Sequence, residues 1–308
     1  MKRRVVQHGP STLIISLPSN WIKQNNVNRG DELDIKENNK TLAITASNHV
    51  SNKSLTQNIS GLEPALVKTF LARIYQKGYD KAYLVHNNIN LLKKIQDKTL
   101  ELIGYEIIEQ NNKYCLIQSI SSHIELDFDN SLRKAFVLAK QMLDTAIKAY
   151  KDNDPDALAG LSIMDLEVNR LCYFCLRQIN KEQYIGTEQA QQSHILYSLI
   201  ESLEHLGDNM VHLGKSLIES KKNPELIKLM QLLFEQFKLV YSYFYESTAE
   251  KANETYRIFV EIGRMVSDVS IARLSGNDLM AAYKIRAASN ELYHFTISKL
   301  DFHAKAYA

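Results

Sequence analysis

The feature that most constrains this 308-residue chain is the spacing of apolar residues in its second half. Apolar side chains recur there at alternating intervals of three and four positions, the pattern of a helix with one buried face. The pattern runs through residues 132–150, 161–179 and 196–217. Only Pro155 and Pro224 interrupt this part of the chain, and each follows a residue type that caps helix starts. The spacing therefore predicts long helices packed side by side.

Three further helical segments are predicted at about 224–247, 250–275 and 278–303. Three helices followed by three more suggest an internal duplication of a three-helix unit. We therefore expect residues 126–308 to form a helical domain of six helices in two three-helix bundles, which makes the chain mainly α.

The first part of the chain is richer in turns, with three of the five prolines and five of the eleven glycines before residue 105. Residues 1–50 are predicted to form short β-hairpins around one helical turn, and residues 51–60 a polar linker. Residues 61–122 alternate helix and strand patterns and are expected to form a small α/β spacer domain. Because a 50-residue module of thin strands buries little apolar surface, we expect it to pair with a second copy as a homodimer.

The net charge of +2 is a sum of unlike parts. The first 30 residues carry five basic side chains and no acidic one, which leaves −3 for the other 278 residues (+2 − 5 = −3). Two copies of such a module would present a positive field able to neutralise DNA phosphates. An ordinary basic N-terminus explains the charge equally well. The five residues are Lys2, Arg3, Arg4, Lys23 and Arg29.

Several functional classes are disfavoured. The chain has no run of about 18 apolar residues, so neither a membrane span nor membrane insertion is expected. Its three cysteines are too few for a disulfide framework, which favours a cytoplasmic location. We find no glycine-rich phosphate loop, GxSxG or HExxH, and therefore expect a protein that is not an enzyme.

One polar face stands out on the helix predicted at 196–217. Three histidines and three carboxylates fall within about 100° of the helix circumference, opposite the leucines. They are His194, Glu201, Glu204, His205, Asp208 and His212. Glu204 and Asp208 lie one turn apart and repel unless a cation or proton lies between them. Carboxylate and imidazole ligands suit Zn, Fe or Mn, while the commoner alternative is a helix face that is merely solvated.

Two other short patterns are weaker. Cys172 and Cys175 form a CxxC without further ligands or a preceding strand, so we expect buried core thiols. Glu291 and His294 form the ExxH pattern of di-iron bundles, but the chain has no second ExxH.

The segment HGPSTLIISLP at 8–18, followed by GDELDI at 30–35, resembles the SpoVT/AbrB family. That resemblance implies a swapped-hairpin fold that forms an intertwined dimer. It also implies that basic residues flanking the first strands and the short helix contact DNA, here Arg3, Arg4, Lys23 and Arg29.

The segment LEHLGD at 203–208 is similar to the LERIGD form of the PhoU motif. The resemblance covers about 126–308 and implies a metal site at Glu204 and Asp208. Its plausible neighbours are Glu201, His205 and His212. In the second copy, Asn290 and His294 replace the carboxylates.

Together the two resemblances imply a transcriptional regulator of phosphate homeostasis, similar to archaeal PhoU-like regulators of phosphate uptake. The alternative is a PhoU-type signalling adaptor that acts on a phosphate transporter ATPase or a sensor kinase without binding DNA. A di-iron metalloprotein is the weaker third possibility.

Overall fold

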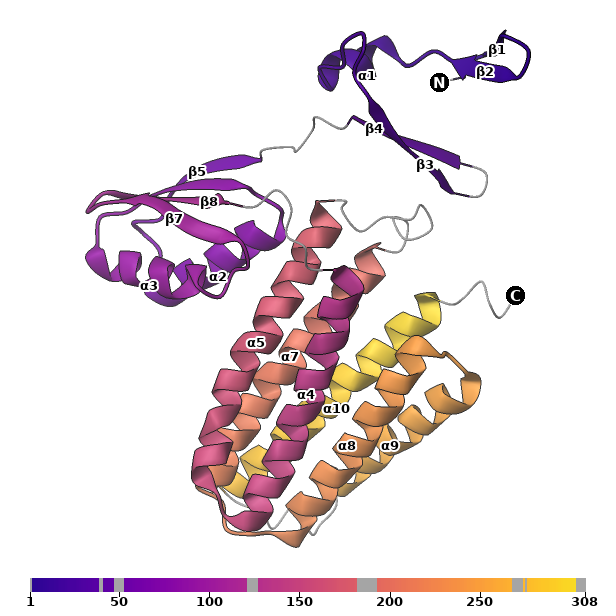
Figure 1. Ribbon diagram of the computed structural model, residues 1–308. Coiled ribbons are helices and arrows are strands. Elements are labelled where there is room, and N and C mark those ends of the chain that lie inside the picture. Colours follow the sequence, from indigo (N-terminus) through magenta and orange to yellow (C-terminus); the bar gives the residue numbers. More distant parts are fainter. Residues whose placement is uncertain are drawn as a thin grey trace. The chain divides into compact units, whose positions relative to one another are not determined.

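The computed structural model describes residues 2–38, 41–46, 53–120, 127–181, 193–267, 274 and 276–302 (Figure 1). The chain divides into two compact units, residues 1–52 and 53–308. The second unit contains both the α/β elements and the long helices.

The first unit consists of two antiparallel hairpins and one short helix. Its elements are β1 (Val5–His8), β2 (Thr12–Ile15), α1 (Ser19–Gln24), β3 (Leu33–Asn38) and β4 (Thr41–Ala46). Gly9 turns the first hairpin with a φ of +80°, a value that glycine adopts without steric cost. The predicted hairpins and the helix after Pro18 are confirmed.

The hairpins of this unit leave apolar side chains open to solvent. Ala46 is the one buried residue among those of the unit whose side chains the structure describes. Seven large apolar residues are 46–68% exposed: Val5, Val6, Leu13, Ile14, Ile15, Ile35 and Leu42. A module with so much open apolar surface is marginal by itself.

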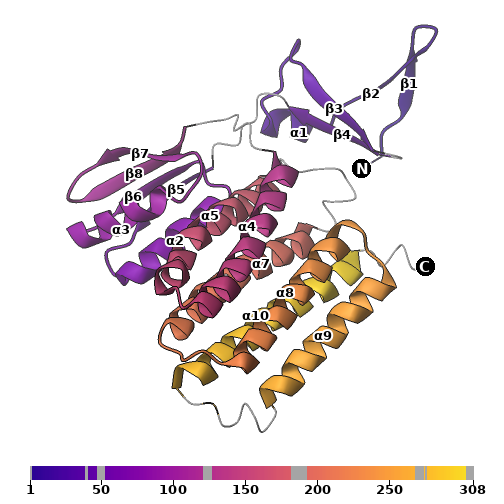
Figure 2. The ribbon, with the colours of Figure 1, turned by 60° about the horizontal axis from the view of Figure 1, so that its bottom comes forward.

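The second unit begins with a four-stranded sheet in the order β5-β6-β8-β7. β5 runs parallel to β6, and the other neighbours are antiparallel. Both helices of this part pack on one face of the sheet (Figure 2). The elements are β5 (Ser54–Asn58), α2 (Pro64–Gln76), β6 (Lys81–Val85), α3 (Ile89–Thr99), β7 (Tyr105–Gln110) and β8 (Tyr114–Ser119).

The predicted linker at 51–60 is wrong for Ser54–Asn58, which form β5. An edge strand is held by backbone hydrogen bonds to its neighbour, and its side chains need not be apolar. Only Leu55 of this strand packs against the core, so the sequence lacks the alternation that marks a half-buried strand.

Six long helices follow in the described part of the chain, three before Asn223 and three after it, as predicted. They are α4 (Phe128–Asp152), α5 (Pro155–Asn180), α7 (Ser193–Ile218), α8 (Pro224–Tyr245), α9 (Ala249–Ser267) and α10 (Gly276–Phe302). Pro155 and Pro224 are first residues of α5 and α8. The side chains of Asp154 and Asn223 accept backbone hydrogen bonds at these helix starts, both at 2.9 Å.

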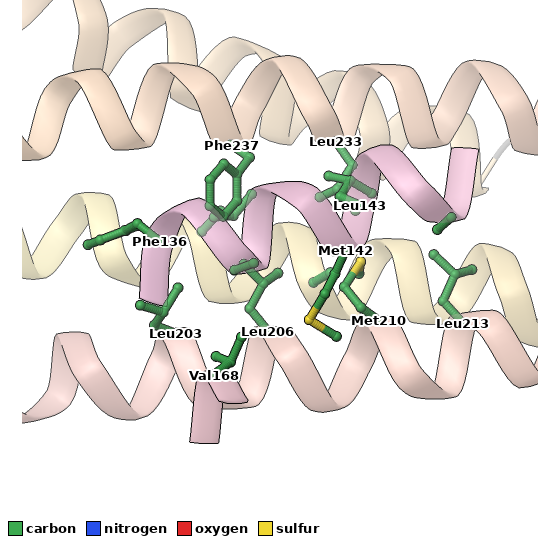
Figure 3. Close-up of a cluster of buried hydrophobic side chains, with 14 of the residues drawn as sticks. Phe136, Met142, Leu143, Val168, Leu203, Leu206, Met210, Leu213, Leu233 and Phe237 are labelled. Carbon is green, nitrogen blue, oxygen red and sulfur yellow. The ribbon is translucent and has the colours of Figure 1, made fainter. Parts of the chain in front are cut away.

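One hydrophobic core runs through both sets of three helices. Leu203, Leu206, Met210 and Leu213 of α7, all in the predicted seam, face inward toward α4 (Figure 3). Phe136 of α4 contacts aromatic residues of α8 and α10. None of the described helices combines the length and apolarity that crossing a membrane requires.

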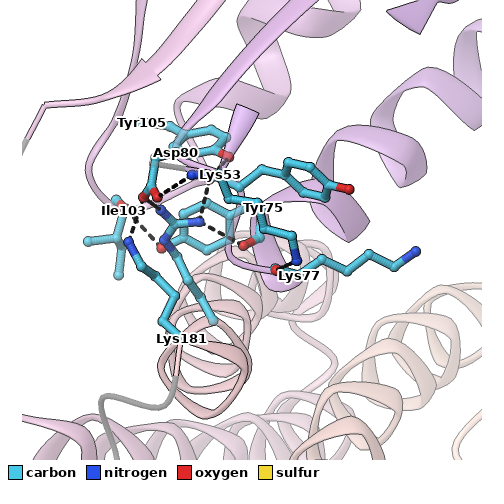
Figure 4. A network of polar contacts seen from close by, with 9 residues as sticks. Lys53, Tyr75, Lys77, Asp80, Ile103, Tyr105 and Lys181 are labelled. Atoms are coloured by element: carbon cyan, nitrogen blue, oxygen red, sulfur yellow. Dashed lines mark hydrogen bonds and ion pairs between the residues drawn. The ribbon is translucent and has the colours of Figure 1, made fainter. Parts of the chain in front are cut away.

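A buried ion network joins the sheet part to the helices (Figure 4). Arg177 of α5 donates from Nη1 to the carbonyl oxygens of Tyr75 and Tyr79, at 2.9 and 2.7 Å. Its Nη2 donates to Asp80 Oδ1 at 2.7 Å, and Lys181 Nζ reaches the same oxygen at 2.6 Å. Both Asp80 and Arg177 are buried. The network therefore fixes α5 against the end of α2 and the start of β6.

Two glycines let α7 approach α5 closely. A Cβ at Gly207 would collide with the Asp165 carboxylate. A Cβ at Gly214 would lie 2.8 Å from Leu161 Cδ1 and 2.9 Å from the carbonyl oxygen of Leu158. Gly160 of α5, in contrast, has nothing near its Cβ position.

We predict that Gly214→Ala destabilises the protein by about 1–2 kcal/mol, because backbone and core atoms must move to admit the methyl group. Gly160→Ala is the matched control and should stabilise by up to about 1 kcal/mol through helix propensity. Urea unfolding followed by circular dichroism measures both. Equal midpoints for the two variants would contradict the close α5–α7 approach.

Candidate functional site

A cavity of about 300 Å³ lies among α2, α3, α5 and α7 of the second unit. Four of the five predicted metal-site residues line it: Glu201, Glu204, His205 and Asp208. His212, the fifth, is exposed and is not among the lining residues. The structure thus brings together most of the polar face predicted on α7, and places it against helices of the α/β part.

Glu204 has polar neighbours on both α5 and α7. Its Oε1 accepts a hydrogen bond from Tyr173 Oη of α5 at 3.0 Å, and its Oε2 lies 3.6 Å from His205 Nε2. Burial, together with the negative charge of Asp208, raises the pKa of Glu204. Glu201 instead pairs with Arg73 of α2, with Oε1 2.6 Å from Nη1.

Asp165 of α5 adds a fourth carboxylate, which the sequence pattern did not indicate. It is 7% exposed, and burial, followed by the charges of Asp208 and Glu204, raises its pKa to about 7. Asn169 Nδ2 donates to Asp165 Oδ2 at 3.1 Å, while Asp165 Oδ1 is buried without a hydrogen-bond partner among the described residues. Asp165 and Asn169 repeat on α5 the four-residue spacing of Glu204 and Asp208.

The donor set suits a divalent cation. Burial and neighbouring negative charge raise the pKa of Asp165 and Glu204, and a positive ion would offset this effect. Oxygen ligands beside an imidazole suit Fe, Mn or Zn. The buried, unpartnered Oδ1 of Asp165 fits this role. In the described ranges, however, no three His, Cys, Asp or Glu side chains already converge as a group that could hold a metal ion. The metal site therefore stays a prediction.

The cysteine pair and the second motif near residue 291 lie in different surroundings. Cys172 and Cys175 are buried core thiols, as predicted, and burial raises the pKa of both. In the second motif, His294 is exposed and Asn290 is half-buried. Glu291 Oε2 lies 3.9 Å from His205 Nδ1, so α10 adds another carboxylate beside the α7 face.

The four predicted DNA-contacting residues all lie in the first unit. Arg3 and Arg4 precede β1, Lys23 is in the last turn of α1, and Arg29 precedes Gly30. All four side chains are exposed. Their exposure meets the first requirement for phosphate contact, and the contact itself stays a prediction.

Residues 132–217 match the family model of the PhoU domain. That range covers most of α4 and α7 and all of α5, including every carboxylate of the cavity. Residues 6–50 match a second family model, described as antidote–toxin recognition MazE, a bacterial antitoxin. The PhoU-like helical domain and the AbrB-like N-terminal module expected from the sequence are confirmed.

A solved structure shares the helical fold. The phosphate transport system regulatory protein PhoU from Streptococcus pneumoniae superposes with a TM-score of 0.50 at 14% sequence identity, covering 56% of this chain and 91% of that one. At this identity the similarity establishes the fold alone. A comparison with curated protein sequences gives no match.

We predict a pH-dependent stability that depends on Asp165, measured with a chelator present. The pKa of this carboxyl is about 7 in the folded state against 3.8 for an ordinary aspartate. As the pH rises from 4 to 7 the unfolded state loses its proton first, so the free energy of unfolding falls, by roughly 2–4 kcal/mol.

Asp165→Asn removes the titrating group and should remove this decrease, leaving the variant more stable than wild type at pH 8. Asp156→Asn, at an exposed position in the first turn of α5, is the control and should keep the wild-type slope. If Asp165→Asn shows the same slope as wild type, the assigned pKa is wrong.

Proposed function

We propose that this chain is a phosphate-homeostasis regulator of the cytoplasm that is not an enzyme. It binds DNA as a dimer through its N-terminal unit and responds to a divalent metal through its PhoU-like helices. The observation that carries the proposal is the presence, in one chain, of an AbrB-like module with exposed basic residues and a PhoU domain with a carboxylate-lined cavity.

Dimerisation is supported by the apolar surface of the first unit. Side chains such as Leu13, Ile35 and Leu42 are more than 60% exposed in the single chain, and a second copy would cover them. Pairing would also bring ten basic residues together from the two 30-residue segments (2 × 5), with no acidic residue among them. Such a surface binds DNA largely through phosphates and with strong salt dependence.

The metal part of the proposal assigns a cation to Asp165, Glu204 and Asp208. The cation would supply positive charge beside Asp165 and Glu204, whose pKa values are raised by burial and by neighbouring negative charge. Glu201 and His205 lie next to this set, and His212 lies outside the cavity. A bound ion changes regulation only if it binds one arrangement of the protein more tightly than another.

Tyr173 connects the carboxylates of the cavity with the sheet domain. Its hydroxyl donates to Glu204, and its ring belongs to the apolar core of the α/β part. A change in the protonation or ligation of Glu204 therefore acts on a side chain that also packs against the sheet domain.

The alternative is a signalling adaptor that uses the same helices to contact a phosphate transporter ATPase or a sensor kinase and does not bind DNA. It is favoured by the fold shared with a phosphate transport regulatory protein. The di-iron alternative lacks a second ExxH.

The DNA-binding hypothesis predicts a specific effect of Arg3→Ala/Arg4→Ala. Removing four positive charges from a dimer should weaken binding to promoter DNA of phosphate-transport genes at least tenfold at low salt, and reduce the slope of log K against log salt by up to about 4. Fluorescence anisotropy across a salt series measures both quantities.

The control is Lys134→Ala/Lys215→Ala, which removes the same charge from exposed positions on the helices. Light scattering establishes that all proteins remain dimers. If wild type shows no preference for promoter over random DNA, or the two double variants bind alike, the adaptor function is favoured instead.

The metal hypothesis predicts that protein purified without chelators holds a divalent cation and that Glu204→Ala/Asp208→Ala loses it, as measured by elemental analysis. Glu250→Ala/Glu254→Ala is the control, because it removes a carboxylate pair of the same spacing from α9. Equal metal content in both variants would disprove the assignment, whereas two irons per chain with oxygen consumption would favour the di-iron alternative.

A further inference from the structure

The cavity has two walls of opposite charge that come from different parts of the second unit. Glu204 and Asp208 lie on the α7 side, with the buried Asp165 in their field. The facing wall carries three basic side chains, Lys68 and Arg73 of α2 and Lys98 of α3. The segregation is complete: these bases belong to the α/β part and these acids to the long helices.

The basic wall, formed by Lys68, Arg73 and Lys98, includes one buried lysine whose position is fixed by its neighbours. Lys98 is only 7% exposed, and its Nζ lies 4.6 Å from the centre of the Tyr173 ring and 2.5 Å from Glu101. Burying a lysine is costly unless its charge is compensated, so its position at the cavity is specified by the fold. Its charge also acts on Asp165, lowering the pKa that burial raises.

The other two bases retain capacity for a ligand. Arg73 uses Nη1 for both Glu201 and Gln76. A guanidinium has five donors in a planar fork that matches an oxyanion. Lys68 is 3.8 Å from Asp97, a distance beyond a hydrogen bond, and 36% of its side chain is exposed.

We propose that this cavity binds a phosphate-type oxyanion, held by Lys68 and Arg73 with Lys98 beside them, on a cation held by the carboxylates. The inference rests on the metal site of the proposed function and names a second ligand for it. The shared chemistry is a tetrahedral phosphate group, free or carried by a small molecule.

Charge and size both support this pair of ligands. An anion alone would meet the repulsion of three carboxylates, and a cation alone would leave the remaining donors of Arg73 and Lys68 without a ligand; together the two ions complement both walls. Thr69, Gln76 and Asn169 supply neutral polar groups to the lining. About 300 Å³ is at the lower end of small-molecule sites, enough for an oxyanion and its cation.

The test is equilibrium dialysis of the full chain against radiolabelled orthophosphate, with Mn²⁺ or with EDTA. We expect binding with Mn²⁺ and at least tenfold weaker binding with EDTA. Lys68→Gln and Arg73→Gln should each weaken phosphate binding at least tenfold while Mn²⁺ content, measured by elemental analysis, stays at the wild-type level. Lys93→Gln, an exposed lysine of α3 outside the lining, should behave as wild type.

The outcomes separate this inference from the function on which it rests. If Mn²⁺ binds but phosphate does not, or if all three variants bind phosphate alike, the oxyanion site is disproved and the metal site stands. If Mn²⁺ does not bind at all, the metal part of the proposed function fails, and phosphate binding unchanged by EDTA disproves the cation bridge. Competition by glycerol phosphate and AMP distinguishes a free phosphate site from one for a phosphorylated small molecule.

Discussion

The arrangement of the second unit depends on the buried charge of Arg177. A guanidinium 3% exposed is tolerated only when its donors are satisfied, and Asp80 with the carbonyl oxygens of Tyr75 and Tyr79 satisfies them. The rings of Tyr75 and Tyr105 lie 4.9 and 5.2 Å from the same guanidinium. Because these partners come from the α/β part, the charge fixes α5 against the sheet domain, and the cavity between α2 and α7 exists only while that junction holds.

The same helix serves both the junction and the cavity. Asp165, Asn169, Tyr173, Arg177 and Lys181 recur at four-residue spacing, four of them on α5 and Lys181 directly after it. The first three contact or line the carboxylate site, and the last two bind Asp80. The cavity and the Asp80 junction are therefore connected by one helix, with Tyr173 at the midpoint.

The long helices could be predicted because apolar spacing and proline-capped starts are local signals, and the predicted seam of α7 is the observed one. The α7 carboxylates were predicted for the same reason.

The edge strand β5 was missed because its polar residues gain stability from backbone pairing with β6. The role of Asp165 was missed because the spacing of apolar residues shows which face of a helix is buried, but does not show which polar residue on that face is buried with it. The four-residue spacing of polar residues from Asp165 onward, within a largely apolar helix, was a signal that could have indicated it. The basic wall could not be predicted from the sequence because Lys68, Arg73 and Lys98 come close to α7 only through tertiary packing.

The four-residue repeat on α5 also limits how such a chain can be assembled from parts in evolution. A helical bundle exchanged for one from another protein would bring an α5 without a matching arginine for Asp80 or a tyrosine for Glu204. It would leave a buried aspartate unpaired and the basic wall without its facing acids. The sheet part and the helices of the second unit therefore depend on one another through these pairs, whereas the chain divides into its two compact units just before Lys53.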